Sequence, residues 1–259
     1  KLGTKQAEDA ILFGDQEKRR YVGGYVSDDN RYLFISAANS TSGNELYLKD
    51  LSVPNSPIVA IHKGFEYDVD VLDNIGTTLF IVTNLKAPNK RIVTVDVANP
   101  GVENWKDLIP ETEQVLNPST GAGYIFANYM KDAVSVVKQF DYKGKLIRTI
   151  ALPGVGTASG FGGKAKDKEL YFSFTNYVTP GTTYTFFPDS GKSSVYVKPK
   201  VDFVSENYES KQVFFTSKDG TKVPMIITHK KGLQLNGKNP TILYGYGGFN
   251  VSLTPSFSI

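Results

Sequence analysis

The residues best suited to chemistry lie in a glycine-rich turn near the carboxyl end, residues 244–249, with the sequence YGYGGF. An apolar segment, Ile242 to Tyr244, leads into it and predicts a short strand. Glycines let a backbone bend sharply where a strand ends, so this turn can aim a phenol and an aromatic ring into a cleft. The alternative for Tyr246 is structural, an amphipathic tyrosine that caps the strand. A phosphate-binding loop is disfavoured because no Lys-Ser/Thr pair follows the glycines.

The residues of a complete hydrolytic site are not evident. A serine hydrolase places its nucleophile in G-x-S-x-G, and the nearest approach, residues 156–160 (GTASG), has its serine one position off and is expected to be a loop. The two histidines, His62 and His229, are interpreted as surface or structurally satisfied side chains. The absence of cysteine excludes disulfides, thiolate metal sites and a cysteine nucleophile. We expect no metal and no cofactor.

The bulk composition is that of an ordinary globular protein, with 40% hydrophobic and 21% charged residues among 259. The basic clusters are short and scattered and the net charge is +3, so solvated loops explain them better than a nucleic-acid surface. No apolar run approaches the ~20 residues that cross a bilayer. The absence of thiols fits the cytoplasm and the periplasm equally. A first residue other than Met suggests a fragment.

Short apolar segments repeat through the first three quarters of the chain with a period of 46 residues. One series keeps this spacing throughout: Phe34, Phe80, Phe126 and Phe172. A second series runs in phase, at spacings of 46, 45 and 48 residues: Asp50, Asp96, Asp141 and Asp189. Periods of about 40 to 50 residues built from short strands are typical of β-propeller blades.

Each period predicts a four-stranded sheet. In the first one, the segments YVGGYVS, RYLFISA, ELYLKDL and PIVAIHK are separated by turn residues. The second segment is apolar on both faces, as expected for a sheet packed between two others. We predict four such sheets over about residues 17–200, with residues 11–14 as the last strand of a preceding unit. The phenylalanines are interpreted as core residues, and the aspartates as side chains that bond their own turns.

The pattern changes after Pro199. Two apolar segments within residues 212–231 predict a hairpin whose turn contains Asp219-Gly220. Asn236-Gly237 predicts the next turn, and a third strand then leads into the glycine-rich turn. We therefore predict two domains, with residues 1–200 as a partial propeller and residues 201–259 as the start of a second domain.

Several segments resemble the prolyl oligopeptidase family. The most specific is YGYGGFNVSLTP at residues 244–255, preceded by SKDGTKVPMIITHKKG at residues 217–232. VENWKDLIPE at residues 102–111 and TNYVTPG at residues 175–181 are similar to propeller segments of that family. The resemblance covers essentially the whole chain.

The resemblance implies a mainly β fold: about four blades of a seven-bladed β-propeller, which acts as a lid, followed by the first strands of an α/β-hydrolase domain. It implies a serine endopeptidase that cleaves short peptides on the carboxyl side of proline. Tyr246 matches the family's oxyanion-hole tyrosine, and Phe249 matches a ring of the proline-binding S1 pocket. The family's nucleophile, acid and base would all follow Ile259, so the chain is expected to be truncated and inactive alone.

The expected partners are short proline-containing peptides and the remainder of the same polypeptide, without nucleic acid or membrane. Two alternatives stay open. The chain could be a non-catalytic propeller module that binds a peptide or protein, or part of an esterase or another peptidase of the same superfamily. The loop from Asn84 to Arg91 is a further candidate for substrate contact, by its likeness to the family alone.

Overall fold

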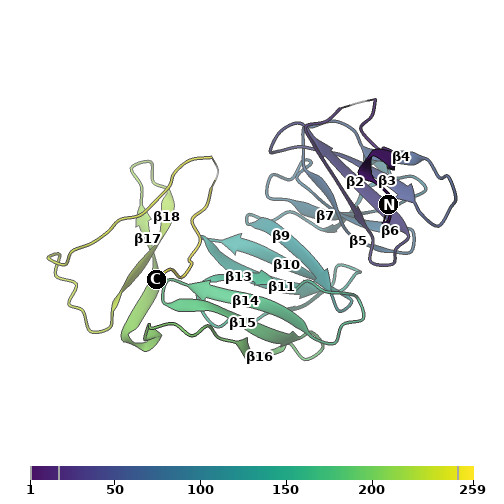
Figure 1. Ribbon diagram of the computed structural model, residues 1–259. Coiled ribbons are helices and arrows are strands. Elements are labelled where there is room, and N and C mark those ends of the chain that lie inside the picture. The colour runs from purple at the N-terminus through teal and green to yellow at the C-terminus, as the bar shows by residue number, and fades with distance from the viewer. Residues whose placement is uncertain (1, 17, 250) are drawn as a thin grey trace. The chain divides into compact units, whose positions relative to one another are not determined.

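Antiparallel strands make up most of this computed structural model, which describes residues 2–16, 18–249 and 251–259. They form four four-stranded sheets and one hairpin (Figure 1). Within each sheet, strands that follow one another in sequence lie side by side, so every sheet is a simple meander. The prediction of four four-stranded sheets is confirmed.

The first two sheets contain β1 (Tyr21–Val26), β2 (Tyr32–Ala38), β3 (Glu45–Asp50), β4 (Ile58–His62), β5 (Val69–Ile75), β6 (Thr78–Thr83), β7 (Arg91–Asp96) and β8 (Lys106–Ile109). The third and fourth contain β9 (Val115–Gly121), β10 (Tyr124–Lys131), β11 (Val134–Phe140), β12 (Leu146–Thr149), β13 (Thr157–Gly160), β14 (Leu170–Asn176), β15 (Thr179–Phe187) and β16 (Lys192–Val197). The hairpin pairs β17 (Tyr208–Thr216) with β18 (Lys222–Lys230).

Helical structure in the described residues is limited to three single turns of 3₁₀ helix: η1 (Gln6–Glu8), η2 (Val102–Asn104) and η3 (Ser205–Asn207). This agrees with a sequence in which no helical periodicity is sustained. No helix in this part of the chain is long and apolar enough to span a membrane.

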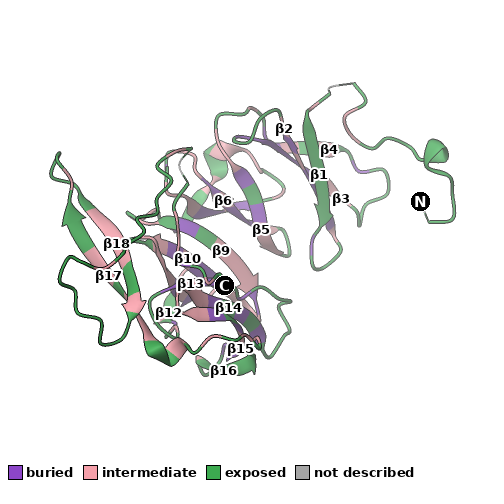
Figure 2. Cartoon of the chain, turned by 60° about the vertical axis from the view of Figure 1, so that its left-hand side comes forward, coloured by how far each residue is buried: buried purple, intermediate pink, exposed green. Residues whose placement is uncertain are grey.

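Contacts divide the chain into two compact units, residues 1–111 and 112–259. In the first unit, apolar side chains of the first and second sheets form one core, which includes Phe34, Leu48 and Ile81. In the second unit, a separate core includes Phe126 and Phe172 from the third and fourth sheets. Figure 2 shows how burial concentrates on the middle strands of the sheets. The predicted domain boundary at residue 200 stays a prediction.

All the repeated residues except Asp189 have the structural roles expected of them. The four phenylalanines are between 0% and 3% exposed, and each lies on the second strand of its sheet, an inner strand whose side chains point to the faces of the sheet. Three of the four aspartates accept a hydrogen bond from the backbone two residues on: Asp50 from Ser52, Asp96 from Ala98 and Asp141 from Lys143. The fourth, Asp189, instead accepts a hydrogen bond from the Tyr124 hydroxyl.

Two predictions for short segments were wrong. Residues 11–14 form no strand. Instead, Phe13 packs its ring 4.8 Å from that of Tyr47, against the small core on the other face of the first sheet. Residues 157–160, expected to be a loop, form β13. Pairing with β14 stabilises this strand although its own sequence, TASG, has little strand preference.

The predicted third strand before the glycine-rich turn is also absent. Ile242, Leu243 and Tyr244 are 93%, 86% and 75% exposed, and they pair with no strand among the described residues. An apolar segment of this kind suits a strand covered on both faces, and the described residues provide no such neighbours. The Asp219-Gly220 hairpin turn is confirmed, with Gly220 at φ +87°.

Candidate functional site

A cavity of about 990 Å³ lies in the second unit. It is lined by turns of the third and fourth sheets and by the part of the chain that follows these sheets. The turns of the third and fourth sheets contribute Asp132, Ala133 and Tyr177. Strand β18 contributes residues 223–228, and the carboxyl-terminal segment contributes residues 241–247 and 251–253. Sequence segments more than 100 residues apart therefore meet around one space, whose volume is in the range of small-molecule sites in proteins.

Tyr246, in the glycine-rich turn, lines this cavity. Gly247 has φ +71°, a left-handed conformation that glycine adopts without strain. The tyrosine is 58% exposed, and its hydroxyl has no hydrogen-bond partner in the described chain. A phenol of this kind is free to donate a hydrogen bond to a group that enters the cavity.

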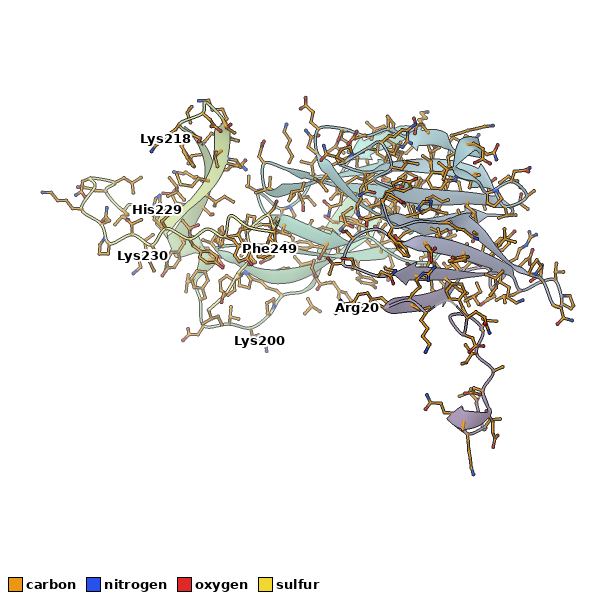
Figure 3. The ribbon with its side chains drawn as sticks, turned by 90° about the horizontal axis from the view of Figure 1, so that it is seen from above. Arg20, Lys200, Lys218, His229, Lys230 and Phe249 are labelled. Carbon is orange, nitrogen blue, oxygen red and sulfur yellow. The ribbon has the colours of Figure 1, made fainter. Side chains whose placement is uncertain are left out.

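Phe249 occupies a different setting. Its side chain is 93% exposed and does not line the cavity. Its backbone has φ +52°, a region that costs a residue with a side chain roughly 1–2 kcal/mol. A hydrogen bond of 3.0 Å from the Val251 amide to the Gly248 carbonyl closes the turn around it. Tyr246 therefore lies at the cavity wall, whereas Phe249 does not line the cavity. Figure 3 labels Phe249 among the side chains of the chain.

The hairpin is held against the third sheet next to the cavity. The side-chain amide of Gln212 donates a 2.6 Å hydrogen bond to the carbonyl of Asp132. Asp132 and Ala133 both have positive φ, 52° and 65°, as in the tight turns that join twisted strands. This turn reaches the cavity because it connects β10 to β11 at the end of the sheet that faces the hairpin.

The turn residues Asp132, Ala133 and Tyr177 were not predicted as part of the site. A signal for them exists in the repeat. The β10–β11 and β14–β15 turns follow the repeated phenylalanines at similar distances: Asp132 lies six residues after Phe126, and Tyr177 lies five residues after Phe172. Equivalent turns lie at the same end of their sheets, so a cavity at one of them is expected to involve the other.

Neither histidine belongs to this cavity. His62 is 5% exposed at the end of β4 in the first unit, and its ring centroid lies 4.6 Å from that of Tyr67. Its Nε2 atom is buried without a hydrogen-bond partner in the described chain, which corrects the prediction of a surface or satisfied histidine. Burial lowers the pKa of His62, opposed by Glu66 and Glu45. His229 places Nδ1 2.9 Å from the Lys230 carbonyl and 3.6 Å from a Glu209 carboxylate oxygen.

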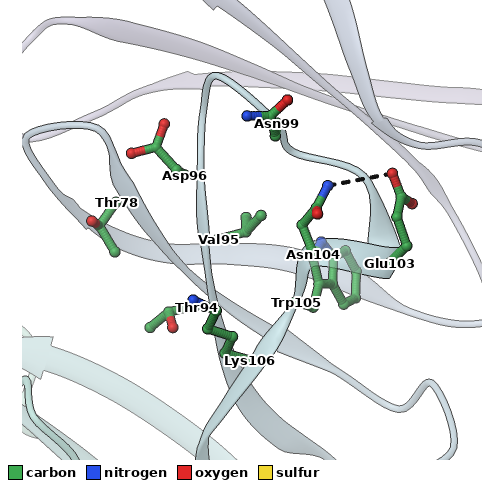
Figure 4. A pocket seen from close by; sticks show the side chains of 9 residues that line it. All are labelled: Thr78, Thr94, Val95, Asp96, Asn99, Glu103, Asn104, Trp105 and Lys106. Carbon is green, nitrogen blue, oxygen red and sulfur yellow. Dashed lines mark hydrogen bonds between the residues drawn. The ribbon is translucent and has the colours of Figure 1, made fainter.

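A smaller cavity, of about 490 Å³, lies on the second sheet (Figure 4). Its wall includes Trp105, whose indole N–H donates to the Pro100 carbonyl at 3.0 Å. The Asn104 amide donates to the Glu103 carboxylate at 3.3 Å. Both bonds are local, so the Trp105 indole and the Asn104 amide have partners within this part of the chain. The described residues include no group of three or more His, Cys, Asp or Glu side chains that could hold a metal.

Comparison with known families and proteins gives a consistent result. Residues 1–199 match the family described as "Prolyl oligopeptidase, N-terminal beta-propeller domain". The chain is 57% identical to a prolyl endopeptidase from Elizabethkingia miricola and 56% identical to one from Elizabethkingia meningoseptica. Each match covers 100% of this chain and 37% of the relative, so the chain spans little more than a third of these proteins.

Solved structures agree with the sequence comparison. One from a structural and mechanistic study of two prolyl endopeptidases has a TM-score of 0.87 and 35% identity, and the match covers 99% of this chain and 38% of that one. Prolyl oligopeptidase B from Galerina marginata, bound to a 35mer hydrolysis and macrocyclization substrate, also has a TM-score of 0.87, with 28% identity. That match covers 100% of this chain and 38% of the Galerina chain.

Proposed function

The chain belongs to the prolyl oligopeptidase family, and we propose that it is part of a serine endopeptidase that cleaves short peptides on the carboxyl side of proline. One observation carries the proposal: the glycine-rich turn brings Tyr246 to a cavity whose other walls are propeller turns and the hairpin. The nucleophile, acid and base would come from the part of the relatives that this chain does not cover. The chain alone is expected to be inactive.

In this proposal, Tyr246 donates its hydroxyl to the oxyanion that forms when a serine attacks the carbonyl next to proline. A donor placed in advance where negative charge develops lowers the barrier, because it needs no reorganisation during the reaction. The free hydroxyl at the cavity wall supports this role.

The proposed role of Phe249 is to form one wall of the proline pocket. A flat apolar ring suits a pyrrolidine, which has no N–H to satisfy. Its 93% exposure means that the ring would meet substrate only where further parts of the full-length protein enclose it. The sheets would restrict entry, because their turns form part of the cavity wall.

The test uses the full-length protein. Fluorophosphonate labelling should mark one serine, and Tyr246→Phe should lower kcat on a proline-containing peptide by roughly 10²–10³-fold. Tyr244→Phe is the matched control, since Tyr244 belongs to the same turn and is expected to be structural. Unchanged turnover in Tyr246→Phe would remove this tyrosine from the mechanism.

Two further measurements separate the alternatives. A full-length protein without a reactive serine would leave a propeller module that binds a peptide or protein partner. Phe249→Ala should raise KM for proline substrates more than for substrates with alanine before the cleaved bond. An equal effect on both, or a preference for esters in a substrate panel, would instead indicate another hydrolase of the same superfamily.

A further inference from the structure

A pair of threonines on the fourth sheet binds the backbone that follows the glycine-rich turn. The Thr157 hydroxyl donates a 2.7 Å hydrogen bond to the Pro255 carbonyl. The Thr175 hydroxyl accepts a 3.1 Å hydrogen bond from the Phe257 amide and donates to the Thr179 carbonyl at 3.0 Å. These bonds join residues 98 and 82 positions apart in the chain.

The two threonine side chains lie next to each other on the fourth sheet. They are direct partners in the register of β13 and β14, so their side chains lie on the same face. Gly156, just before β13, allows the strand to begin close to its neighbour: a Cβ there would lie 2.4 Å from the Thr175 carbonyl oxygen. Pro255 is buried at this contact.

Aromatic packing completes the attachment. The Phe257 ring lies 5.0 Å from that of Phe203, measured between centroids, and the Phe203 ring stacks at 4.8 Å on Tyr208 at the start of β17. The segment 255–257 is therefore fixed to the fourth sheet and to the entry of the hairpin.

Thr157 differs in type from the residues at the equivalent position of the other three sheets. The position three residues after the repeated phenylalanine pairs with a first-strand residue in every sheet, giving the pairs Val22↔Ala37, Val69↔Thr83, Leu116↔Tyr129 and Thr157↔Thr175. The first-strand residue is apolar in three sheets and carries a hydroxyl only in the fourth, where the tail is bound. The sheet itself does not need a hydroxyl at the position of Thr157, since valine or leucine occupies the equivalent position in the other three sheets.

The turn that carries Tyr246 differs in its attachment on its two sides, between the hairpin that ends at Lys230 and the chain end. Before the turn, the described hydrogen bonds are local, such as that from the Thr241 hydroxyl to the Asn239 carbonyl. After the turn, the bonds to Thr157 and Thr175 attach the chain to a sheet. The position of the turn relative to the cavity therefore depends on the attachment of residues 255–257 to the fourth sheet.

We propose that Thr157 and Thr175 are positioning residues: their hydroxyls hold residues 255–257 and thereby fix the place of the Tyr246 phenol in the cavity. The proposal rests on the proposed function for its catalytic consequence, but the attachment itself does not. Both hydroxyls bind backbone atoms, so the site selects the path of the chain rather than a particular side chain.

The first test measures the attachment without reference to activity. In the full-length protein, Thr157→Val with Thr175→Val should make the amides of residues 251–259 exchange hydrogen faster, because the Phe257 amide loses its acceptor. Valine keeps the shape and strand preference of threonine, and it is already present at the position equivalent to Thr157 in the first two sheets. Unchanged exchange in this segment would overturn the proposal.

The chain provides a matched control. Thr83 occupies the position in the second sheet that Thr175 occupies in the fourth, and its hydroxyl also bonds two backbone groups, the Asp68 carbonyl and the Leu85 amide. Thr83→Val removes the same chemistry without touching the tail, so exchange in residues 251–259 should not change. Thr157→Ser with Thr175→Ser keeps both hydroxyls and should restore the wild-type exchange rate.

The second test links the threonine pair to Tyr246. Displacing a catalytic group by about 1 Å can cost up to ~100-fold in rate, so the double valine variant should lower kcat by at least about tenfold with KM changed less than about twofold. In a Tyr246→Phe background the valines should have no further effect on kcat, because the phenol they position is already absent. Multiplicative losses would overturn the positioning role. If Tyr246→Phe alone leaves turnover unchanged, the proposed function fails, while the exchange result still decides whether the attachment exists.

Discussion

Among single residues, His62 combines burial with a ring nitrogen that has no partner in the described chain. Burial disfavours the charged imidazolium, so the pKa of His62 is lowered in the folded state relative to the ordinary value of 6.5. The folded protein then binds fewer protons at this site than the unfolded chain does near and below that pH. Its contribution to stability is therefore complete above about pH 6.5 and is lost as the pH falls from there through the lowered pKa.

The corresponding prediction concerns His62→Gln. The free energy of unfolding of the wild type should decrease from pH 7.5 to pH 5, and the variant should show a smaller decrease over the same range. Denaturant midpoints at closely spaced pH values would measure this. An equal pH dependence in both proteins would show that other groups cause the loss at low pH.

The candidate site could be predicted at the residue scale only in part. The glycine-rich turn was evident from composition, and the structure places Tyr246 at the cavity. The roles of Tyr246 and Phe249 stay predictions, since both depend on groups that would bind or react outside this chain. Thr157 and Thr175 were not predicted, because a hydroxyl that serves a segment 80 to 100 residues later has no local signal. Comparison of the four sheets singles out Thr157 only once the strand register is known.

At the scale of elements, the connection between β2 and β3 depends on a close approach at Gly43. Its amide donates a 2.8 Å hydrogen bond to the Asp68 carboxylate, and its backbone has φ +74°. A Cβ at this position would lie 1.8 Å from the Phe65 carbonyl oxygen. The left-handed backbone disfavours a side chain, and the contact with Phe65 leaves no room for one.

We therefore expect Gly43→Ala to destabilise the protein by about 2–5 kcal/mol, the sum of a conformational and an overpacking cost. Gly76→Ala is the control: Gly76 also has positive φ, at 58°, but nothing lies within 4 Å of its ideal Cβ. It should cost only about 1–2 kcal/mol. Chemical denaturation of both variants would measure the difference, and equal costs would show that the Phe65 loop moves aside.

The strands were the most predictable elements where the repeat supports them. A 46-residue period and two apolar faces are enough to place four sheets. The failures occur where a segment's state depends on neighbours. Residues 157–160 become a strand because β14 supplies a partner, whereas residues 242–244 lack one in the described chain despite a sequence that suits a strand.

On the whole-molecule scale, the fourth sheet ends in a strand with an open edge. All six residues of β16 are exposed, and Val195, Tyr196 and Val197 are 57%, 61% and 53% exposed. Exposed apolar edge strands pair readily with other chains. Nearby lysines, Lys192 and Lys198, limit this tendency at the two ends of the strand.

A chain of residues 1–259 produced alone should therefore associate as its concentration rises, and Val195→Lys should reduce that association. Sedimentation velocity over a range of concentrations would measure the effect. Val53→Lys is the control, because Val53 is 51% exposed but lies in a turn rather than at a strand edge. An equal reduction by both variants would attribute the effect to net charge instead of the edge.

The threonine pair also orders events during folding. Its two hydroxyls come from different strands and are neighbours only once β13 and β14 have paired. Before these two strands pair, residues 255–257 lack the pair of hydroxyls that binds them, and the proposed positioning of Tyr246 is not in effect. In the proposed positioning role, the Tyr246 phenol therefore takes its place only in a chain whose fourth sheet has formed.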